Sequence, residues 1–429
     1  MVRKLKHTEI GDIPVDWELQ TFDETFRVIS NNTLSRENLN NRGGAVRNIH
    51  YGDILTKFPE VLDCSEDEIP FVNDLSLLSS STQLLQDGDI VVADTAEDET
   101  VGKVIEVQNL GDSKLVAGLH TIPCRVKKGE FAPGWLGYYM NSDLFHNQIL
   151  PYITGIKVSS ISKGAISETL ILVPPFDEQE KIVQSLNKIQ LLMTAETKVV
   201  NKIKLVKNGC LSKMFPQKDD TVPEIRLPGF TEAWEQRKLG DIYGSIGNAF
   251  VGTATPYYAE HGHFYLESNN VKDGQINHNA EIFINDEFYE KQKDKWLHTG
   301  DMVMVQSGHV GHAAVIPEEL DNTAAHALIM FRNPKEEIEP YFLNYEYQTD
   351  KAKKQIENIT TGNTIKHILA SDMQEFVVDI PKYEEQKAIA GYFCKLDHLI
   401  TLHQRKCDKY SSIKKGMMSD LLTGKIRLV

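Results

Sequence analysis

The chain has 429 residues, of which 41% are hydrophobic and 25% charged, a composition typical of a soluble globular protein with two to four domains. No apolar run reaches the roughly 18 residues of a membrane span, and residues 1–12 lack the apolar core of a secretory signal. A cytoplasmic protein without membrane contact is therefore expected. The five cysteines form no C-x-x-C pair, which disfavours a structural zinc or a disulfide framework.

The charge of the chain is unevenly distributed. The net charge of −15 taken alone argues against nucleic acid as a partner. However, residues 60–100 contain twelve Asp or Glu and no Lys or Arg, whereas residues 197–218 contain six Lys and no acidic residue. Because local charge and not net charge decides binding, the net charge does not exclude a nucleic-acid partner.

Most of the chain is an internal repeat with an offset of about 207 residues. The segment L-V-P-P-F-D-E-Q-E-K-I at 172–182 aligns with D-I-P-K-Y-E-E-Q-K-A-I at 379–389, so the proline, the Glu-Gln pair and the last isoleucine recur. Further matches are Gly155 with Gly362, Ile161 with Ile368, G-D-I-V at 88–91 with G-D-M-V at 300–303, His120 with His326, and D-W-E at 16–18 with A-W-E at 233–235. The repeat predicts two copies of one structural unit.

Each copy is predicted to consist of a mixed region followed by one long helix. The first mixed region covers 1–178 and includes a strand at 88–93, entered from a Gly-Asp turn. A helix over 179–215 ends at Pro216, and three prolines mark residues 216–229 as a linker. The second copy has a mixed region over 230–385, with a strand at 300–305 and helical residues at 340–359, then a helix over 386–422 and a tail over 423–429.

Both long helices carry apolar residues at spacings of 4, 3, 4 and 7, the seam of a coiled coil. At 1.5 Å per residue, each is roughly 55 Å long. The expected fold is α+β, with two heads separated by a pair of long antiparallel coiled-coil helices and an internal pseudo-twofold repeat. Alternatively, each helix packs on its own head. The seam residues are Ile182, Leu186, Ile189, Met193, Glu196, Val200 and Ile203 in the first helix, and Ile389, Phe393, Leu396, Ile400, His403, Cys407 and Tyr410 in the second.

Two seam positions are polar. Glu196 and His403 are separated by 207 residues, and in an antiparallel pairing they are expected to meet near the middle of the helices. A polar pair in a seam can fix the register, and a carboxylate beside an imidazole raises the pKa of the histidine. Two solvated residues in a loosely packed layer are the alternative.

The sequence offers no catalytic or metal-binding motif. G-K at 424–425 lacks the spacing of a phosphate-binding loop, and the zinc motif H-E-x-x-H is absent. P-P-F at 174–176 follows a valine, which cannot hold the amino group that a methyltransferase modifies. Asp379 with Glu385 and Lys387 imitates a nuclease motif that the first copy does not repeat. No catalytic residue, no metal and no cofactor of its own are expected, although sequence cannot exclude a catalytic triad.

Recognition of DNA is the favoured function for the polar loops. Residues 30–51 are rich in Asn and Arg, whose side chains pair with the edges of A and G, and glycines near Lys157 and Lys366 suit phosphate contacts. Ordinary surface loops and turns are the alternative. The residues expected to contact DNA are Asn31, Asn32, Arg36, Arg42, Arg47, His50, Tyr51 and Lys157 in the first copy, and Asn269, Asn270, Lys272, Gln306, Ser307, His309, Asn363, Thr364 and Lys366 in the second.

Taken together, the motifs of the chain resemble those of the specificity (S) subunits of bacterial type I restriction–modification systems. These motifs are Trp17 and Trp234, the Gly-Asp strands and the Pro…Glu-Gln-x-x-Ile helix starts. The segment L-P-G-F-T-E-A-W-E at 227–235 is similar to the opening of the second target-recognition domain of this family. The resemblance covers nearly the whole chain.

The resemblance implies that each head is a target-recognition domain for one half of a split double-stranded DNA target. Two methyltransferase (M) subunits would bind the chain and methylate adenine with S-adenosylmethionine, and translocase/nuclease (R) subunits using ATP and Mg²⁺ would join for restriction. The S subunit itself would be non-catalytic and bacterial-cytoplasmic, and the acidic residues 60–100 would face protein or solvent. A stand-alone DNA-modifying enzyme and a coiled-coil adaptor without DNA contact remain the alternatives.

Overall fold

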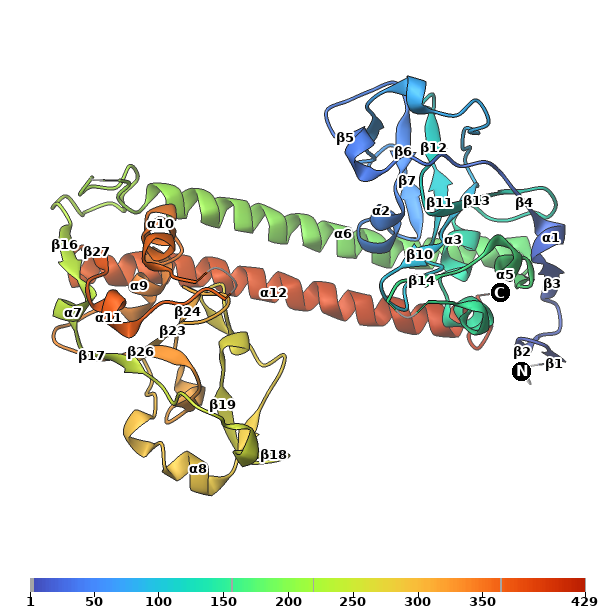
Figure 1. Ribbon diagram of the computed structural model, residues 1–429. Coiled ribbons are helices and arrows are strands. Elements are labelled where there is room, and N and C mark those ends of the chain that lie inside the picture. The colour runs from blue at the N-terminus through green and yellow to red at the C-terminus, as the bar shows by residue number, and fades with distance from the viewer. Residues whose placement is uncertain (1–3, 156, 219, 363–364, 429) are drawn as a thin grey trace. The chain divides into compact units, whose positions relative to one another are not determined.

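The computed structural model describes residues 4–155, 157–218, 220–362 and 365–428 (Figure 1). The chain divides into two compact units: unit 1 contains residues 1–196 and 406–429, and unit 2 contains residues 197–405. The long helices α6 (Phe176–Lys213) and α12 (Tyr383–Leu421) each contribute to both units. The compact units therefore do not follow the predicted segment boundaries, because each contains part of both helices.

Unit 1 is built on a five-stranded sheet of order β4-β13-β9-β11-β7, accompanied by a four-stranded sheet of order β12-β6-β8-β5. Strands β4, β13, β9 and β11 pair antiparallel, and β7 pairs parallel to β11. The core contains Trp17, Trp135 and Tyr139. Its strands are β1 (Leu5–Thr8), β2 (Gly11–Pro14), β3 (Glu18–Thr21), β4 (Phe26–Val28), β5 (Leu39–Asn40), β6 (Arg47–Ile49), β7 (Val61–Asp63), β8 (Phe71–Val72), β9 (Ile90–Ala93), β10 (Thr95–Ala96), β11 (Val104–Gln108), β12 (Leu115–Ala117), β13 (Thr121–Val126), β14 (Ser159–Ser160) and β15 (Leu170–Val173). Its short helices are α1 (Phe22–Thr25), α2 (Tyr51–Thr56), α3 (Trp135–Tyr139), α4 (Asp143–Ile149) and α5 (Lys163–Ser167).

Unit 2 contains two four-stranded sheets, of order β17-β26-β23-β24 and β18-β22-β19-β25. Its core gathers Phe215, Trp234, Phe342 and Phe393. Its strands are β16 (Glu235–Lys238), β17 (Tyr243–Asn248), β18 (Tyr258–Ala259), β19 (His263–Leu266), β20 (Val271–Lys272), β21 (Gln275–Ile276), β22 (Phe283–Ile284), β23 (Met302–Val305), β24 (Ala313–Val315), β25 (Ala324–Ala325), β26 (Leu328–Pro334) and β27 (Val377–Ile380). Its short helices are α7 (Leu239–Ile242), α8 (Asp286–Glu290), α9 (Pro340–Glu346), α10 (Asp350–Ile359) and α11 (Ala370–Gln374).

The sheet topology confirms the internal repeat. The order β4-β13-β9-β11 in unit 1 recurs as β17-β26-β23-β24 in unit 2, and the pair β3–β15 recurs as β16–β27. The two predicted strands are β9 and β23, each preceded by a Gly-Asp turn. The glycines of these turns, Gly88 and Gly300, have φ of 83° and 87°, a conformation that favours glycine.

The strand register corrects one predicted match between the copies. Ala93 pairs with Thr121 in unit 1, and Val305 pairs with Leu328 in unit 2. The residue before Thr121 is His120, so its counterpart is Ala327 rather than His326. The two residues share an uncommon left-handed backbone, with φ of 55° and 53°. The identity of a histidine is therefore not enough to locate the strand register.

The long helices begin three residues earlier than predicted, at Phe176 and Tyr383, and end at Lys213 and Leu421. The backbone hydrogen bonds show where each helix begins, because the carbonyl of Pro175 accepts from Glu178 N and Gln179 N, and the carbonyl of Lys382 accepts from Glu385 N and Gln386 N. The Glu-Gln pair lies within the first turn and fastens it. Gln179 donates from Nε2 to the carbonyl of Pro174 at 2.8 Å, and Gln386 does the same to Pro381 at 2.9 Å.

Within each unit, parts of α6 and α12 run antiparallel. In unit 2, Lys207 contacts Asp397 and Cys210 contacts Tyr392, so the partner number falls as the α6 number rises. In unit 1, Gln190 contacts Lys414 and Glu196 contacts Lys406 in the same sense. The pairing of Glu196 with His403 would join residues of different units, and it stays a prediction.

An arginine and a glutamate fasten the start of each long helix. In unit 1, Glu178 is buried and accepts hydrogen bonds from Arg427 at 2.6 and 2.7 Å and from Trp17 Nε1 at 2.9 Å. In unit 2, Glu385 is buried and accepts two hydrogen bonds from Arg226 at 2.7 and 2.6 Å. Each arginine follows the end of the other long helix in sequence. The glutamate that recurs in the repeat therefore stabilises the structure, because in each unit it pairs with an arginine that follows the other long helix in sequence.

Candidate nucleic-acid interface

The Asn-rich loop of the first head is held together largely by its own predicted site residues. Asn32 is buried, donates to Asn48 Oδ1 and the Ala117 carbonyl, and accepts from Leu34 N. Asn31 donates to the carbonyls of Gly118 and Thr121 at 3.1 and 2.9 Å. Asn32 is thus an internal residue, contrary to the prediction, because its amide satisfies backbone groups that burial would otherwise leave unpaired.

The three predicted arginines of this loop have different surroundings. Arg36 forms an ion pair with Asp53 at 2.6 Å, but its side chain is half exposed. Arg47 donates to the carbonyl of Cys64 at 2.6 Å and lies over the ring of Phe71. Arg42 is exposed, and its side chain makes no hydrogen bond or ion pair with the residues that the structure describes. Arg42 is therefore the arginine best placed to bind an external group.

An aromatic cluster lies next to this loop. Tyr51 contacts the ring of His50 at 4.7 Å and that of His120 at 5.2 Å between centroids. His50 caps α2 by accepting from Gly52 N, and burial lowers its pKa below the usual value, which favours the neutral ring. His120 lies 3.4 Å from Asp94 and its side chain is 45% exposed. His120 was not among the predicted site residues, and its left-handed backbone is visible only in the structure.

In each head, a pair of bridged residues encloses a short segment with a glycine in the left-handed conformation, Gly155 in unit 1 and Gly362 in unit 2. In unit 1, Thr154 pairs with Ser160 across the turn that carries the exposed Lys157. In unit 2, Thr361 pairs with His367, which also pairs with Ser307, and Lys366 accepts from Gly308 N. The structure therefore brings Lys366 next to the strand end that carries Gln306, Ser307 and the exposed His309. Asn363 and Thr364 lie outside the described residues.

The predicted Asn-Asn-x-Lys segment of the second head is partly internal. Asn270 is buried, accepts from Glu267 N, and donates to the carbonyls of Asn277 and Ala280. It therefore shapes the loop instead of facing solvent, which corrects the prediction. Asn269 and Lys272 are exposed, and Lys272 lies in the short hairpin of β20 and β21.

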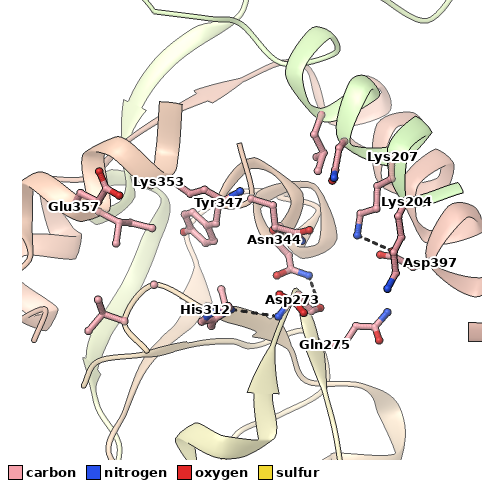
Figure 2. Close-up of a pocket in the computed structure, with 18 of the residues that line it drawn as sticks. Lys204, Lys207, Asp273, Gln275, His312, Asn344, Tyr347, Lys353, Glu357 and Asp397 are labelled. Carbon is pink, nitrogen blue, oxygen red and sulfur yellow. Dashed lines mark hydrogen bonds and ion pairs between the residues drawn. The ribbon is translucent and has the colours of Figure 1, made fainter. Parts of the chain in front are cut away.

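A pocket of about 650 Å³ in unit 2 adjoins these residues (Figure 2). It is lined by Lys204 and Lys207 of α6, by Lys353 of α10, and by the hairpin residue Lys366. Only Lys366 was predicted as a site residue. The other three lysines come from helices distant in sequence, so no local sequence pattern could reveal the pocket.

The lysines of this pocket differ in burial. Lys207 is nearly buried, donates to Asp397 at 2.7 Å and lies over the ring of Tyr345 at 5.1 Å. Lys204, Lys353 and Lys366 are exposed, and their ammonium groups make no hydrogen bond or ion pair within the described part of the chain. His312 also lines the pocket, and burial lowers its pKa, which favours the neutral ring. The pocket thus presents ammonium groups that are available to a ligand.

All fourteen predicted seam residues are buried or half-buried. Ile182 and Leu186 belong to the core of unit 1, and Phe393 belongs to the core of unit 2, so burial alone does not place the residues between the helices, and the seam stays a prediction. Within residues 4–155, 157–218, 220–362 and 365–428, no group of three or more His, Cys, Asp or Glu is arranged to hold a metal ion. None of the helices described is long and apolar enough to cross a membrane.

Comparisons with known proteins identify the family. Residues 14–205 and 231–409 match the family described as type I restriction modification DNA specificity domain. The MjaX type I restriction enzyme specificity subunit of Methanocaldococcus jannaschii is 26% identical over 99% of this chain and 96% of its own length. The MjaVIII specificity subunit of the same organism is 23% identical over 64% of this chain and 66% of its own.

Solved structures agree with this fold. The S subunit of a type I restriction–modification system from M. genitalium matches 98% of this chain and 99% of its own, with a TM-score of 0.57 and 13% identity. A structure concerned with complex assembly of the type I R-M system matches 96% and 99%, with a TM-score of 0.52 and 15% identity. The chain therefore belongs to the family of type I restriction–modification DNA specificity subunits, which are non-catalytic, and carries two DNA specificity domains.

Proposed function

We propose that this chain reads a double-stranded DNA target in two halves, one with each head, inside a complex with two methyltransferase subunits. The observation that carries the proposal is the repeated sheet, β4-β13-β9-β11 and β17-β26-β23-β24, with different loops in the two copies. A shared scaffold with divergent polar loops suits two readers of different sequences, because direct recognition depends on the side chains that reach base edges.

The long helices supply a surface for the methyltransferase subunits. Leu191 on the unit 1 part of α6 is 69% exposed, and Leu205 on the unit 2 part is 72% exposed. Val206 and Leu402 are also exposed within unit 2. Exposed apolar side chains on helices that already bury a seam favour docking of another protein. S-adenosylmethionine would be bound by these partners, and ATP and Mg²⁺ by translocase/nuclease subunits where these join, in the bacterial cytoplasm.

Exchange of one head tests the bipartite reading. The first head would be replaced by that of a related specificity subunit, joined near Gln179, and the variant expressed with its methyltransferase subunits. Mapping of methylated adenines is expected to show one altered half-site and one unchanged half-site, because each head has its own core. Alteration of both halves would contradict independent reading, and a complex that binds no DNA would favour an adaptor.

Substitution on the helices tests the docking surface separately. Leu205→Glu is expected to weaken co-purification of the methyltransferase subunits, since it places a charge in an apolar contact. Leu77→Glu is a matched control, because Leu77 is 51% exposed and lies in the first head, away from the helices in sequence. Equal co-purification of both variants with the wild type would contradict docking at this surface.

A further inference from the structure

The lysine pocket of unit 2 has an excess of positive charge that no described residue neutralises. Asp397 is neutralised internally, because it accepts from Lys207 at 2.7 Å and from the Tyr345 hydroxyl at 2.7 Å. Lys204, Lys353 and Lys366 then face two carboxylates in the lining, those of Asp273 and Glu357. With His312 neutral, the available groups carry one net positive charge.

The wall of the pocket also contains polar atoms without partners. The Asn344 side chain donates to the Gly274 carbonyl at 2.8 Å, but its Oδ1 has no hydrogen-bond partner among the described residues. The same is true of the Tyr347 hydroxyl, and both residues are at least 97% buried. Buried polar groups of this kind are rare in native proteins, and a Tyr hydroxyl can both donate and accept a hydrogen bond.

The first head has no equivalent cationic pocket in its sequence. The residues 207 positions from Lys204, Lys353 and Lys366 are Ser411, His146 and Ser159. The correspondence is supported by the structure, because Thr349 and Ser142 cap the equivalent helices α10 and α4, and Thr361 and Thr154 begin the equivalent hairpins. The three lysines are therefore specific to the pocket of unit 2 and do not recur at the equivalent positions of the repeat.

We infer that this lysine pocket binds one backbone phosphate of the DNA target, with Lys204 bringing the spacer helix α6 into contact with DNA. The inference rests on the proposed function. A phosphodiester carries a single negative charge, which matches the excess in the pocket, whereas a nucleoside triphosphate carries several. Lys366 links the pocket to the strand end with Gln306 and Ser307, so a phosphate held there would place DNA beside the residues predicted to read it.

The salt dependence of DNA binding tests this inference. Wild-type and Lys204→Gln/Lys353→Gln/Lys366→Gln chains would be assembled with methyltransferase subunits and titrated with target duplex at 50–200 mM salt. Loss of one phosphate contact is expected to reduce the slope of log K against log salt by about 0.9. The methylated sequence should stay the same, since a phosphate contact positions DNA without reading it.

The control replaces three exposed lysines on the same two helices that do not line the pocket, Lys198, Lys202 and Lys354. It is expected to keep the wild-type slope. An unchanged slope in the pocket variant would overturn the inference. So would binding of ATP or inorganic phosphate to the wild-type complex that the pocket variant loses without any change in slope, which would show a free-anion site. Absence of target binding by the wild-type complex would instead overturn the proposed function itself.

Discussion

Replacement of Arg427 by alanine should destabilise unit 1 selectively. Glu178 accepts four hydrogen bonds, two from Arg427 and one each from Trp17 Nε1 and Leu428 N. The substitution removes two of them and leaves a carboxylate whose side chain is 2% exposed without its cation. Loss of one partner from a buried pair costs about 3–5 kcal/mol. Because the Arg427 side chain is 20% exposed and gives up less on burial, we expect the lower end, about 3 kcal/mol.

Hydrogen exchange measured by mass spectrometry reports the loss of stability for each unit separately. A loss of about 3 kcal/mol corresponds to roughly 150-fold faster exchange of the protected amides of β9 and β13, at 1.36 kcal/mol per tenfold change. Amides of β23 and β26 in unit 2 serve as an internal reference. Lys425→Ala is the matched control, because Lys425 is an exposed cation two residues away. Its exchange rates should equal those of the wild type.

A second substitution distinguishes charge from packing. Addition of Glu178→Gln to Arg427→Ala removes the unpaired buried charge, so the double variant should be more stable than Arg427→Ala alone by about 1 kcal/mol or more. The reasoning would be refuted if Arg427→Ala changed exchange in unit 1 less than threefold. It would also be refuted if the double variant were less stable than the single one, since the loss would then come from packing.

Three further perturbations follow from the same structure. Lys207→Met should destabilise unit 2 by about 3 kcal/mol, because it leaves the Asp397 carboxylate, whose side chain is 15% exposed, without its cation. Addition of Asp397→Asn should recover part of this loss. Hydrogen-exchange rates in unit 2 of Lys207→Met that equal those of the wild type would contradict the prediction. Ala327→Gly should stabilise unit 2 by about 1 kcal/mol, because glycine tolerates φ of 53°. His120→Gly should stabilise unit 1 by less, since it removes the contact with Asp94. The melting temperatures of the two variants, each compared with that of the wild type, test this difference. Burial raises the pKa of Glu346 well above its ordinary value, so its contribution to stability is present below about pH 4.5 and is lost as the pH rises toward the raised pKa. In Glu346→Gln, the stability of unit 2 measured by hydrogen exchange should therefore decline less steeply as the pH rises. A decline as steep as that of the wild type would refute the prediction.

The features that repeat in the sequence are those that could be predicted from it. The heptad spacing of residues such as Ile182, Leu186 and Phe393 reports which face of a helix is buried, and the structure buries all three. The Gly-Asp strands were predictable because a turn needing a left-handed glycine precedes a short apolar run. The repeat predicted two copies of one structural unit, whereas the family could be predicted only because motifs such as the Trp17 and Trp234 segments resemble those of known specificity subunits.

The loops were harder to interpret, because one side chain can serve two purposes. Asn32 and Asn270 have the chemistry of base readers, but their amides pair with backbone groups inside the heads. Only the surrounding structure decides between an external ligand and the chain's own backbone. The lysine pocket could not be predicted either, because Lys204, Lys353 and Lys366 come together only after α6, α10 and a hairpin have packed.

The discontinuous make-up of unit 1 has a consequence for synthesis on the ribosome. Residues 197–405 form unit 2 and are contiguous, so they can fold as soon as they have emerged. Unit 1 is made first in large part, yet its core includes Leu421 and Leu422, and Glu178 awaits Arg427. The unit translated first is therefore the one that completes its folding last. A chain released before Arg427 would contain a folded unit 2 and an incompletely folded unit 1.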